Sequence, residues 1–245
     1  MQKAVFNWSG GKDSSLTLYH LLKNKEYDVR WLLTSMSHEY RRISMHGVRE
    51  ELLDKQAQSI GIPLHKLIVP TMPSMETYNN LFLDTLNRFR REGIEHSVFG
   101  DIFLEDLRAY REKQLAKVNM KGVFPIWKQP TDRLVREFID LGFKAVIVCT
   151  SDRYLDKSFA GRVIDSKFLK DLPPGIDPCG ENGEFHSFVY EGPIFKKPIK
   201  IKTGEVIHKK YTPPPKDKTP SNDTYAPSCP FDAGFWYCDV VLAEN

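Results

Sequence analysis

Residues 9–14 read SGGKDS and directly follow the apolar run AVF at residues 4–6. Glycines let backbone N–H groups approach an oxyanion closely, and the start of a helix adds unpaired donors and a favourable dipole. Lys12 adds a full positive charge, and the hydroxyl groups of Ser9 and Ser14 can donate further hydrogen bonds. These residue types at this spacing predict a phosphate-binding loop between a strand and a helix.

The loop differs from the common nucleotide-binding motifs. A Walker A loop requires G-x-x-x-x-G-K-[ST], but here Asp13 follows Lys12 and no glycine stands five residues before Gly11. Gly10 and Gly11 do not fit G-x-G-x-x-G either. An acid beside a phosphate cradle is repulsive unless a cation intervenes, so Asp13 is a candidate Mg²⁺ ligand. The alternative is that Asp13 only caps the helix.

The elements that must position this loop alternate between short apolar runs and amphipathic segments. Strands are expected at residues 4–8, 29–35, 64–69, 97–102, 122–126 and 144–149. Helices are expected at residues 14–23, 47–60, 75–91, 105–118 and 132–141. This alternation predicts an α/β fold built of βαβ units, with a parallel sheet and helices on both faces. Ligands of such sheets bind beyond the carboxyl ends of the strands, where the SGGKDS loop would lie.

The pattern changes after about residue 150. A helix is expected at 155–172, antiparallel strands at 185–190, 198–202 and 206–210 around Thr203-Gly204, and a last strand at 235–242. The Pro-rich polar segment 212–230 is expected to be a mobile loop. We therefore predict an α/β domain over residues 1–150 and a smaller α+β part over residues 151–245.

Composition excludes several classes of protein. Hydrophobic residues make up 41% and charged residues 27% of the 245 residues, as in an ordinary globular protein. The formal charge of +3 is too near balance to indicate nucleic-acid binding by itself. The four cysteines form no C-x-x-C pair, so no structural metal is expected. With no long apolar run and no secretory signal pattern, we expect a cytoplasmic protein without a membrane partner.

The SGGKDS loop resembles the PP-loop of the ATP pyrophosphatase superfamily, whose fold is the adenine nucleotide alpha hydrolase-like (HUP-like) fold. Its members hold the pyrophosphate end of ATP and cleave between the α- and β-phosphates. They form an adenylate that a nucleophile then attacks. The resemblance implies that residues 9–14 bind ATP together with Mg²⁺.

A second stretch narrows the family. Residues 179–195 read CGENGEFHSFVYEGPIF and resemble the G-E-G-G-E-[FY]-E-T signature of the diphthine–ammonia ligase family, which joins a PP-loop domain to a smaller C-terminal part. Further segments agree in order: LLTSMS at 32–37, Met45-His46, FGDI at 99–102, Arg108 with Glu112, the region of Trp127, and FAGRVID at 159–165. The resemblance extends to about Phe195.

The family reaction amidates the carboxylate of diphthine, a modified histidine on translation elongation factor 2. ATP activates the carboxylate, and ammonia displaces AMP. A carboxylate is unreactive toward ammonia until one oxygen becomes a good leaving group, and adenylation supplies that group. The resemblance therefore implies ATP, Mg²⁺, ammonia and a carboxylate acceptor, with Lys12 neutralising charge at the α-phosphate.

The resemblance also implies roles for individual residues. Besides residues 9–14, the nucleotide is expected to contact Thr34, Met36, His46 and Gly100. Catalytic roles are expected for Lys12, Asp13, Asp101 and Glu184, and Asp13 and Asp101 are the candidate Mg²⁺ ligands. The acceptor is expected to contact Arg162, Cys179, Gly180, Glu181, Asn182, Gly183, Glu184 and Phe185.

Several of these residues have an alternative interpretation. Glu181 and Glu184 can bind a cationic substrate or accept a proton from ammonia, but acids in a turn are often only solvated. His46 at a helix start can be a cap or a packing residue, and Arg162 can form a surface ion pair. Cys179 invites a thiol-transfer role, but no partner cysteine stands at suitable spacing.

The chain departs from the family signature where the substrate is expected. Asn182 replaces the second glycine, and His186-Ser187 replaces Glu-Thr, so one carboxylate is lost and an imidazole is gained. A related ammonia ligase acting on a different carboxylate therefore stays open.

The stretch 196–218 is rich in lysine. It can bind nucleic acid, but we favour an edge strand on which lysines prevent aggregation. Two other functions stay open: a tRNA-modifying PP-loop enzyme and a non-enzymatic ATP-binding sensor.

Overall fold

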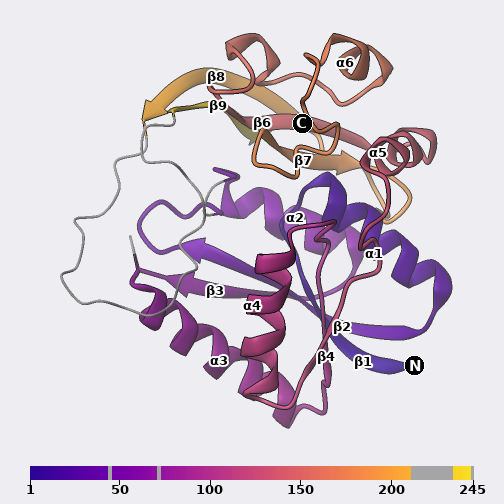
Figure 1. The fold of residues 1–245 in the computed structure, drawn as a ribbon, viewed down its shortest axis with the longest axis vertical. Coiled ribbons are helices and arrows are strands. Elements are labelled where there is room, and N and C mark those ends of the chain that lie inside the picture. Colours follow the sequence, from indigo (N-terminus) through magenta and orange to yellow (C-terminus); the bar gives the residue numbers. More distant parts are fainter. Residues whose placement is uncertain (44–45, 71–72, 211–233, 244–245) are drawn as a thin grey trace.

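The chain folds around two β-sheets that share a hydrophobic core (Figure 1). The computed structural model describes residues 1–43, 46–70, 73–210 and 234–243. The first sheet has the order β3-β2-β1-β4-β5, and all its strand pairs are parallel. Its strands are β1 (Gln2–Asn7), β2 (Tyr27–Ser37), β3 (Leu64–Val69), β4 (His96–Val98) and β5 (Lys121–Val123). The prediction of an α/β fold with a parallel sheet is confirmed.

Helices cover both faces of this sheet because neighbouring side chains of a strand point to opposite faces. Ala4 and Phe6 of β1 belong to one buried cluster with Leu16, whereas Val5 belongs to another with Leu86. The helices are α1 (Lys12–Asn24), α2 (Glu50–Ile60), α3 (Met75–Arg91), α4 (Glu105–Ala116) and α5 (Thr131–Asp140). As Figure 1 shows, α1 and α2 lie between the two sheets, and α3 and α4 cover the other face of the parallel sheet.

The second sheet is antiparallel and has the order β7-β6-β9-β8. Its strands are β6 (Lys144–Ser151), β7 (Phe185–Glu191), β8 (Ile201–Lys210) and β9 (Gly234–Leu242). The expectation that residues 144–149 extend the parallel alternation is therefore wrong. Except for Lys144, every residue of β6 is buried, and a continuous apolar run reads the same in either kind of sheet.

The chain passes from the parallel to the antiparallel sheet between β5 and β6. The second sheet therefore begins at Lys144, before the predicted boundary at residue 150. The largest buried cluster joins both sheets, with Phe6 and Trp8 on one side and Phe185 and Phe188 on the other. The division of the chain at residue 150 stays a prediction. No helix in the described part of the chain is long and apolar enough to cross a membrane.

The expected helix at 155–172 is wrong, because this region holds two short helical segments. These are η1 (Lys157–Phe159) and α6 (Ser166–Asp171). Asp156 accepts a hydrogen bond from the N–H of Ser158, and Asp165 accepts one from the N–H of Phe168, each at 2.7 Å. Asp156 caps the N-terminus of η1, and Asp165 caps that of α6. Two separate helix starts therefore replace the one expected helix.

The hairpin expected around Thr203-Gly204 is also absent from the described residues. Instead, β8 is one strand that pairs with β9 over most of its length, with an irregularity between Thr203 and Val206. A glycine inside a strand pattern often marks such a bulge rather than a turn. The expected loop at 212–230 lies outside the described residues.

Candidate active site

The SGGKDS loop joins β1 to α1, as predicted. Gly10 has a φ of +75°, and a Cβ there would lie 2.6 Å from Oε1 of Gln56. Gly11 is the N-cap residue of α1. Ser14 Oγ donates to the Gly11 carbonyl at 3.0 Å and lies 3.0 Å from Ser9 Oγ. The loop is thus a tight turn closed by its own hydroxyl groups.

A single buried glutamine fixes this turn to the rest of the protein. Gln56 of α2 accepts a hydrogen bond from Trp8 Nε1 at 2.9 Å and donates to the carbonyls of Gly10, at 3.0 Å, and Val189, at 2.6 Å. The N–H of Val189, in β7, also donates to the Gly10 carbonyl at 2.9 Å. No sequence motif marks Gln56, because an isolated glutamine forms no recognisable pattern with its neighbours.

Lys12 connects the loop to the C-terminal part. Its ammonium lies 2.8 and 2.7 Å from the two carboxylate oxygens of Asp13 and donates to the backbone carbonyl of Cys179. It also lies 5.6 Å from the centre of the Phe185 ring. The Lys12 backbone N–H donates to Ser187 Oγ at 3.1 Å. Residues of β7 and of the loop before it therefore surround the predicted phosphate site.

The Lys12 side chain is only 3% exposed and still holds its charge. Burial lowers the pKa of Lys12, but the Asp13 carboxylate and its neighbours outweigh this and raise the pKa above its ordinary value. A buried, permanent cation with N–H groups beside it can stabilise phosphate oxygens strongly, because little water screens it.

Asp101 follows β4 and faces the same region. Arg111 of α4 forms an ion pair with it at 2.7 Å. Burial raises the pKa of Asp101, Arg111 opposes that shift, and the charge of Asp13 adds to it. A Cβ on Gly100 would lie 3.1 Å from the Ser14 backbone nitrogen. A side chain at residue 100 would therefore require the first turn of α1 to shift by a few tenths of an ångström.

Asp13 and Asp101, the candidate Mg²⁺ ligands, do not make up a complete metal site. Among the described residues, no three or more His, Cys, Asp or Glu side chains are arranged to hold a metal ion. Asp13 and Asp101 each contact a cation of the chain itself. Mg²⁺ is commonly held by one or two carboxylates, several waters and substrate phosphates. The two carboxylates fit a phosphate-bound Mg²⁺ and not a site built from protein ligands alone.

Glu181 connects the loop before β7 to the segment that follows β4. Its Oε1 accepts a hydrogen bond from the N–H of Ile102 at 2.8 Å. Burial, with a further contribution from the Asp13 charge, raises the pKa of Glu181 to about 8. A carboxyl group with such a pKa can exchange a proton near neutral pH.

Glu184 has a different environment and is only 2% exposed. Its carboxylate accepts hydrogen bonds from the N–H of Asp177 at 3.0 Å and from the backbone and side-chain nitrogens of Asn182 at 2.9 and 3.1 Å. Three donors inside the same loop favour a role in holding the loop. The catalytic role expected for Glu184 stays a prediction.

The surroundings of Cys179 do not favour a thiol-transfer role, and those of Arg162 favour an ion pair. Burial raises the pKa of the Cys179 thiol, which donates to the Thr131 carbonyl at 3.3 Å. A protonated thiol is a poor nucleophile. Arg162 forms an ion pair with Asp171 at 2.7 Å and lies over the Phe159 ring.

Thr34 and Met36 of β2 lie in the interior. Thr34 is 3% exposed and donates to the Trp8 carbonyl at 2.5 Å, and Met36 is fully buried in the core. Their side chains therefore support the strand that flanks the phosphate loop. Contact with a nucleotide stays a prediction for both residues.

His46, expected near the nucleotide, is stacked on His186 of β7. The ring centres are 4.2 Å apart and the planes are inclined by 17°. Burial, reinforced by the charge of Lys12, lowers the pKa of His186 to about 4, and the pKa of His46 also falls well below its ordinary value. Both imidazoles are neutral at pH 7. The sequence showed His186 as a departure from a signature but did not show that it meets His46.

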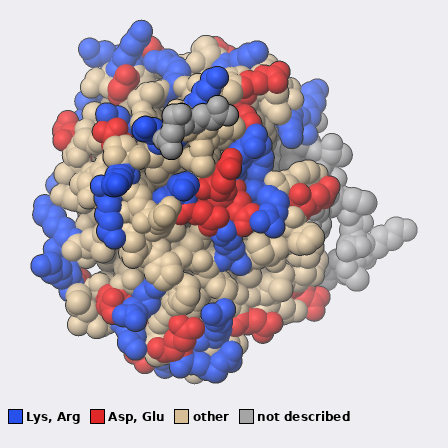
Figure 2. Space-filling model, turned by 180° about the vertical axis from the view of Figure 1, so that it is seen from behind, with Lys and Arg blue, Asp and Glu red and all other residues tan. Residues whose placement is uncertain are grey.

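The site therefore combines a phosphate cradle, a buried cation, several carboxyl groups and a pair of neutral imidazoles. Figure 2 shows the charged groups over one face of the molecule, where acidic and basic atoms are mixed and one compact acidic group lies near the centre. An anionic nucleotide can bind at the cradle while the carboxyl groups handle protons or cations beside it.

Two family models match most of this chain. The model of the diphthamide synthase N-terminal domain matches residues 1–122, and that of the diphthamide synthase C-terminal domain matches residues 130–212. The human diphthine–ammonia ligase is 23% identical over 186 residues, covering 70% of this chain and 68% of the relative. The zebrafish (Danio rerio) enzyme is 24% identical over 246 residues, covering 89% of each chain.

One solved structure resembles the fold in part. The U34-tRNA thiolase NcsA from Methanococcus maripaludis, with its [4Fe-4S] cluster, is 22% identical, with a TM-score of 0.36. The similarity covers 58% of this chain and 57% of the thiolase. A score of this size supports no functional inference.

Proposed function

We propose that this chain, which belongs to the diphthamide synthase family, is an ATP-dependent ligase that adenylates a carboxylate and amidates it with ammonia. One observation carries the proposal. The Lys12 ammonium of the phosphate loop contacts the Cys179 carbonyl of the loop with the family signature. The group suited to phosphate and the segment suited to the acceptor therefore lie at one place.

The phosphate loop would bind the triphosphate of ATP. The free N–H groups in the first turn of α1 and the Lys12 ammonium would contact the phosphate oxygens and stabilise the charge that develops as pyrophosphate leaves. Mg²⁺, which Asp13 and Asp101 would help to hold, supplies further neutralisation of phosphate charge when it is bound.

The acceptor would lie against the loop of residues 177–184. A carboxylate brought beside the α-phosphate attacks it, AMP is transferred to the carboxylate and pyrophosphate leaves. Ammonia then attacks the acyl carbon and AMP departs. Glu181, with a pKa of about 8, would in its ionised form take the proton that the attacking nitrogen must lose. Relatives named diphthine–ammonia ligase favour diphthine on elongation factor 2 as the acceptor.

Release of pyrophosphate tests this proposal directly. The protein is mixed with ATP and Mg²⁺, with and without ammonia, in the presence of diphthine-bearing elongation factor 2, bulk tRNA or a pool of small carboxylates. Lys12→Ala serves as the blank. Release that requires both ammonia and the elongation factor supports the proposal in full.

The other outcomes separate its parts. Ammonia-dependent release with the carboxylate pool alone keeps the chemistry and replaces the acceptor. Release with tRNA alone indicates an RNA-modifying enzyme. ATP binding without any release indicates a nucleotide sensor, and the ligase proposal is then wrong.

A further inference from the structure

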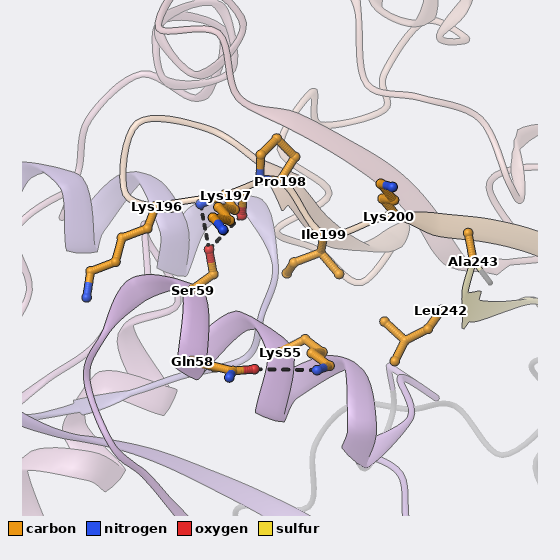
Figure 3. A pocket seen from close by; sticks show the side chains of 10 residues that line it. All are labelled: Lys55, Gln58, Ser59, Lys196, Lys197, Pro198, Ile199, Lys200, Leu242 and Ala243. Carbon is orange, nitrogen blue, oxygen red and sulfur yellow. Dashed lines mark hydrogen bonds between the residues drawn. The ribbon is translucent and has the colours of Figure 1, made fainter. Parts of the chain in front are cut away.

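A groove with a volume of about 580 Å³ lies between α2 and the segment that leads into β8, and none of its described lining residues belongs to the phosphate loop (Figure 3). Its lining comes from three separate parts of the chain: the last turns of α2, residues 196–200, and the end of β9. Neither the proposed ligase chemistry nor the family signature involves this groove.

The groove is basic. Lys55, Lys196, Lys197 and Lys200 line it, and none of its described lining residues is acidic. None of the four ammonium groups forms an ion pair with a described carboxylate. Of the three acids of α2, Glu50 and Asp54 both pair with Lys66, and Glu51, one turn before Lys55, is exposed and forms no ion pair with a described lysine of the groove. The positive charge of the groove is therefore not neutralised within the described chain.

One of the four lysines has a structural explanation. The Lys196 ammonium lies over Gly61, since a Cβ there would be 2.6 Å from its nitrogen. Gly61 ends α2, and a cation at a helix C-terminus is favourable. Protection of the sheet edge can explain lysines within β8 but not Lys55, which belongs to a helix. Lys55, Lys197 and Lys200 need another explanation.

The groove is held in shape by hydrogen bonds. Ser59 Oγ donates to the Lys197 carbonyl at 2.6 Å and accepts from the Lys197 N–H at 3.1 Å. The N–H of Lys196 donates to the Ser59 carbonyl at 3.0 Å, and that of Ala243 donates to the Lys200 carbonyl at 2.9 Å. The charges are thus presented on a framework that exists before any ligand binds, which lowers the entropic cost of binding.

The floor of the groove is aliphatic. The side chains of Ile199 and Leu242 point into the space between the helix and the strand segments (Figure 3). A small polyphosphate has no apolar group that could pack against Ile199 and Leu242. Single-stranded nucleic acid would be held by aromatic stacking, and no aromatic side chain is among the described lining residues.

We propose that this groove, formed by α2, residues 196–200 and the end of β9, docks an acidic segment of a partner protein that carries apolar side chains between its carboxylates. The carboxylates pair with Lys55, Lys197 and Lys200, and an apolar side chain covers Ile199 and Leu242. β8 begins directly after Lys200 and is the edge strand of its sheet. An extended peptide can therefore continue along that edge.

Binding to an array of extended peptides tests the proposal. The array alternates Asp or Glu with Leu, Val or Phe, and each peptide has a partner with Asn or Gln in place of the acids and another with Gly in place of the apolar residues. Single-stranded RNA is the competing probe. We expect the acidic, apolar peptides to bind best and to bind more weakly as salt rises from about 50 to about 200 mM.

Variants locate the site. Lys55→Gln, Lys197→Gln and Lys200→Gln combined should weaken binding by about tenfold or more, since each exposed pair contributes up to about 1 kcal/mol. The control is Lys113→Gln, Lys167→Gln and Lys170→Gln combined, which removes the same charge from exposed positions elsewhere and should leave binding within about twofold. ATP-dependent pyrophosphate release should be the same in both triple variants.

Four results would overturn the proposal. They are equal binding of the neutral peptides, equal loss in the two triple variants, tighter binding of RNA than of every acidic peptide, and no peptide binding at about 1 mM, where even weak docking is measurable.

Discussion

Lys12 Nζ donates a hydrogen bond to the backbone carbonyl of Cys179, 167 residues later in the chain. The same ammonium holds both carboxylate oxygens of Asp13. A phosphate that binds at the loop must therefore compete with two acceptors of the protein for one buried cation. Binding of ATP and the position of the loop at residues 177–184 should be coupled for this reason.

Replacement of Lys12 by methionine, which keeps the aliphatic volume, should reduce pyrophosphate release by about 100-fold or more, because the buried charge that we propose to stabilise the leaving phosphate is lost. The measurement is the initial rate at saturating ATP. Lys23→Met, at the exposed end of the same helix, is the control and should retain the wild-type rate. A Lys12→Met protein with a normal rate would contradict the assigned role.

Replacement of Gln56 by leucine should lower the free energy of unfolding by about 2–3 kcal/mol, because the Trp8 indole N–H and the Val189 carbonyl lose the hydrogen bond to this side chain and the Gly10 carbonyl keeps only the one from the Val189 N–H. Gln58→Leu, two residues later on the exposed side of α2, should change stability by less than about 0.5 kcal/mol. Urea unfolding measures both. If the two variants lose equal stability, Gln56 does not anchor the phosphate loop.

Stability should fall between about pH 6.5 and pH 4 because of His186. The pKa of His186 is lowered to about 4 by burial and by Lys12, whereas the unfolded state has an ordinary histidine pKa of about 6.5. In this window the unfolded state binds more protons than the folded state, so acid favours unfolding; above about pH 6.5 the effect vanishes.

The test compares urea unfolding at several pH values for the wild type and His186→Gln. The variant should show a shallower loss of stability between about pH 6.5 and pH 4. The exposed imidazole of His38 provides the control, and His38→Gln should follow the wild-type curve. Identical slopes in the wild type and His186→Gln would show that His186 does not cause the effect.

Replacement of Asp101 by asparagine should raise the Mg²⁺ concentration for half-maximal pyrophosphate release by about fivefold or more, since one of the two carboxylates proposed to help hold Mg²⁺ is lost. Asp106→Asn, exposed in the first turn of α4, should leave that concentration unchanged. A lowered melting temperature with an unchanged Mg²⁺ requirement would instead mean that Asp101 serves only to hold Arg111.

Replacement of Glu184 by glutamine distinguishes a positioning role from a catalytic one. The amide places an N–H₂ group against N–H donors of Asp177 or Asn182, so stability should fall by about 1–3 kcal/mol and the KM for the acceptor should rise. A catalytic carboxyl would show the reverse pattern, with kcat reduced by about 100-fold or more and stability retained. Calorimetry and steady-state kinetics on one sample decide between them.

Local sequence patterns predicted much of the fold. The ranges of α1 to α5 lie close to those expected, because apolar side chains at helical spacing mark a buried face whatever that face packs against. The loop at residues 9–14 was predicted for a similar reason, since its glycines, lysine and hydroxyl groups suit phosphate by their own chemistry.

The tertiary structure decided which distant parts meet. The apolar run of β6 suits either sheet, and only packing against β7 and β9 assigns it to the antiparallel one. The stacking of His46 on His186 and the contact of Lys12 with Cys179 join residues more than a hundred positions apart. Such contacts leave no periodic trace in the sequence, because they depend on how whole layers pack and not on the local shape of the chain.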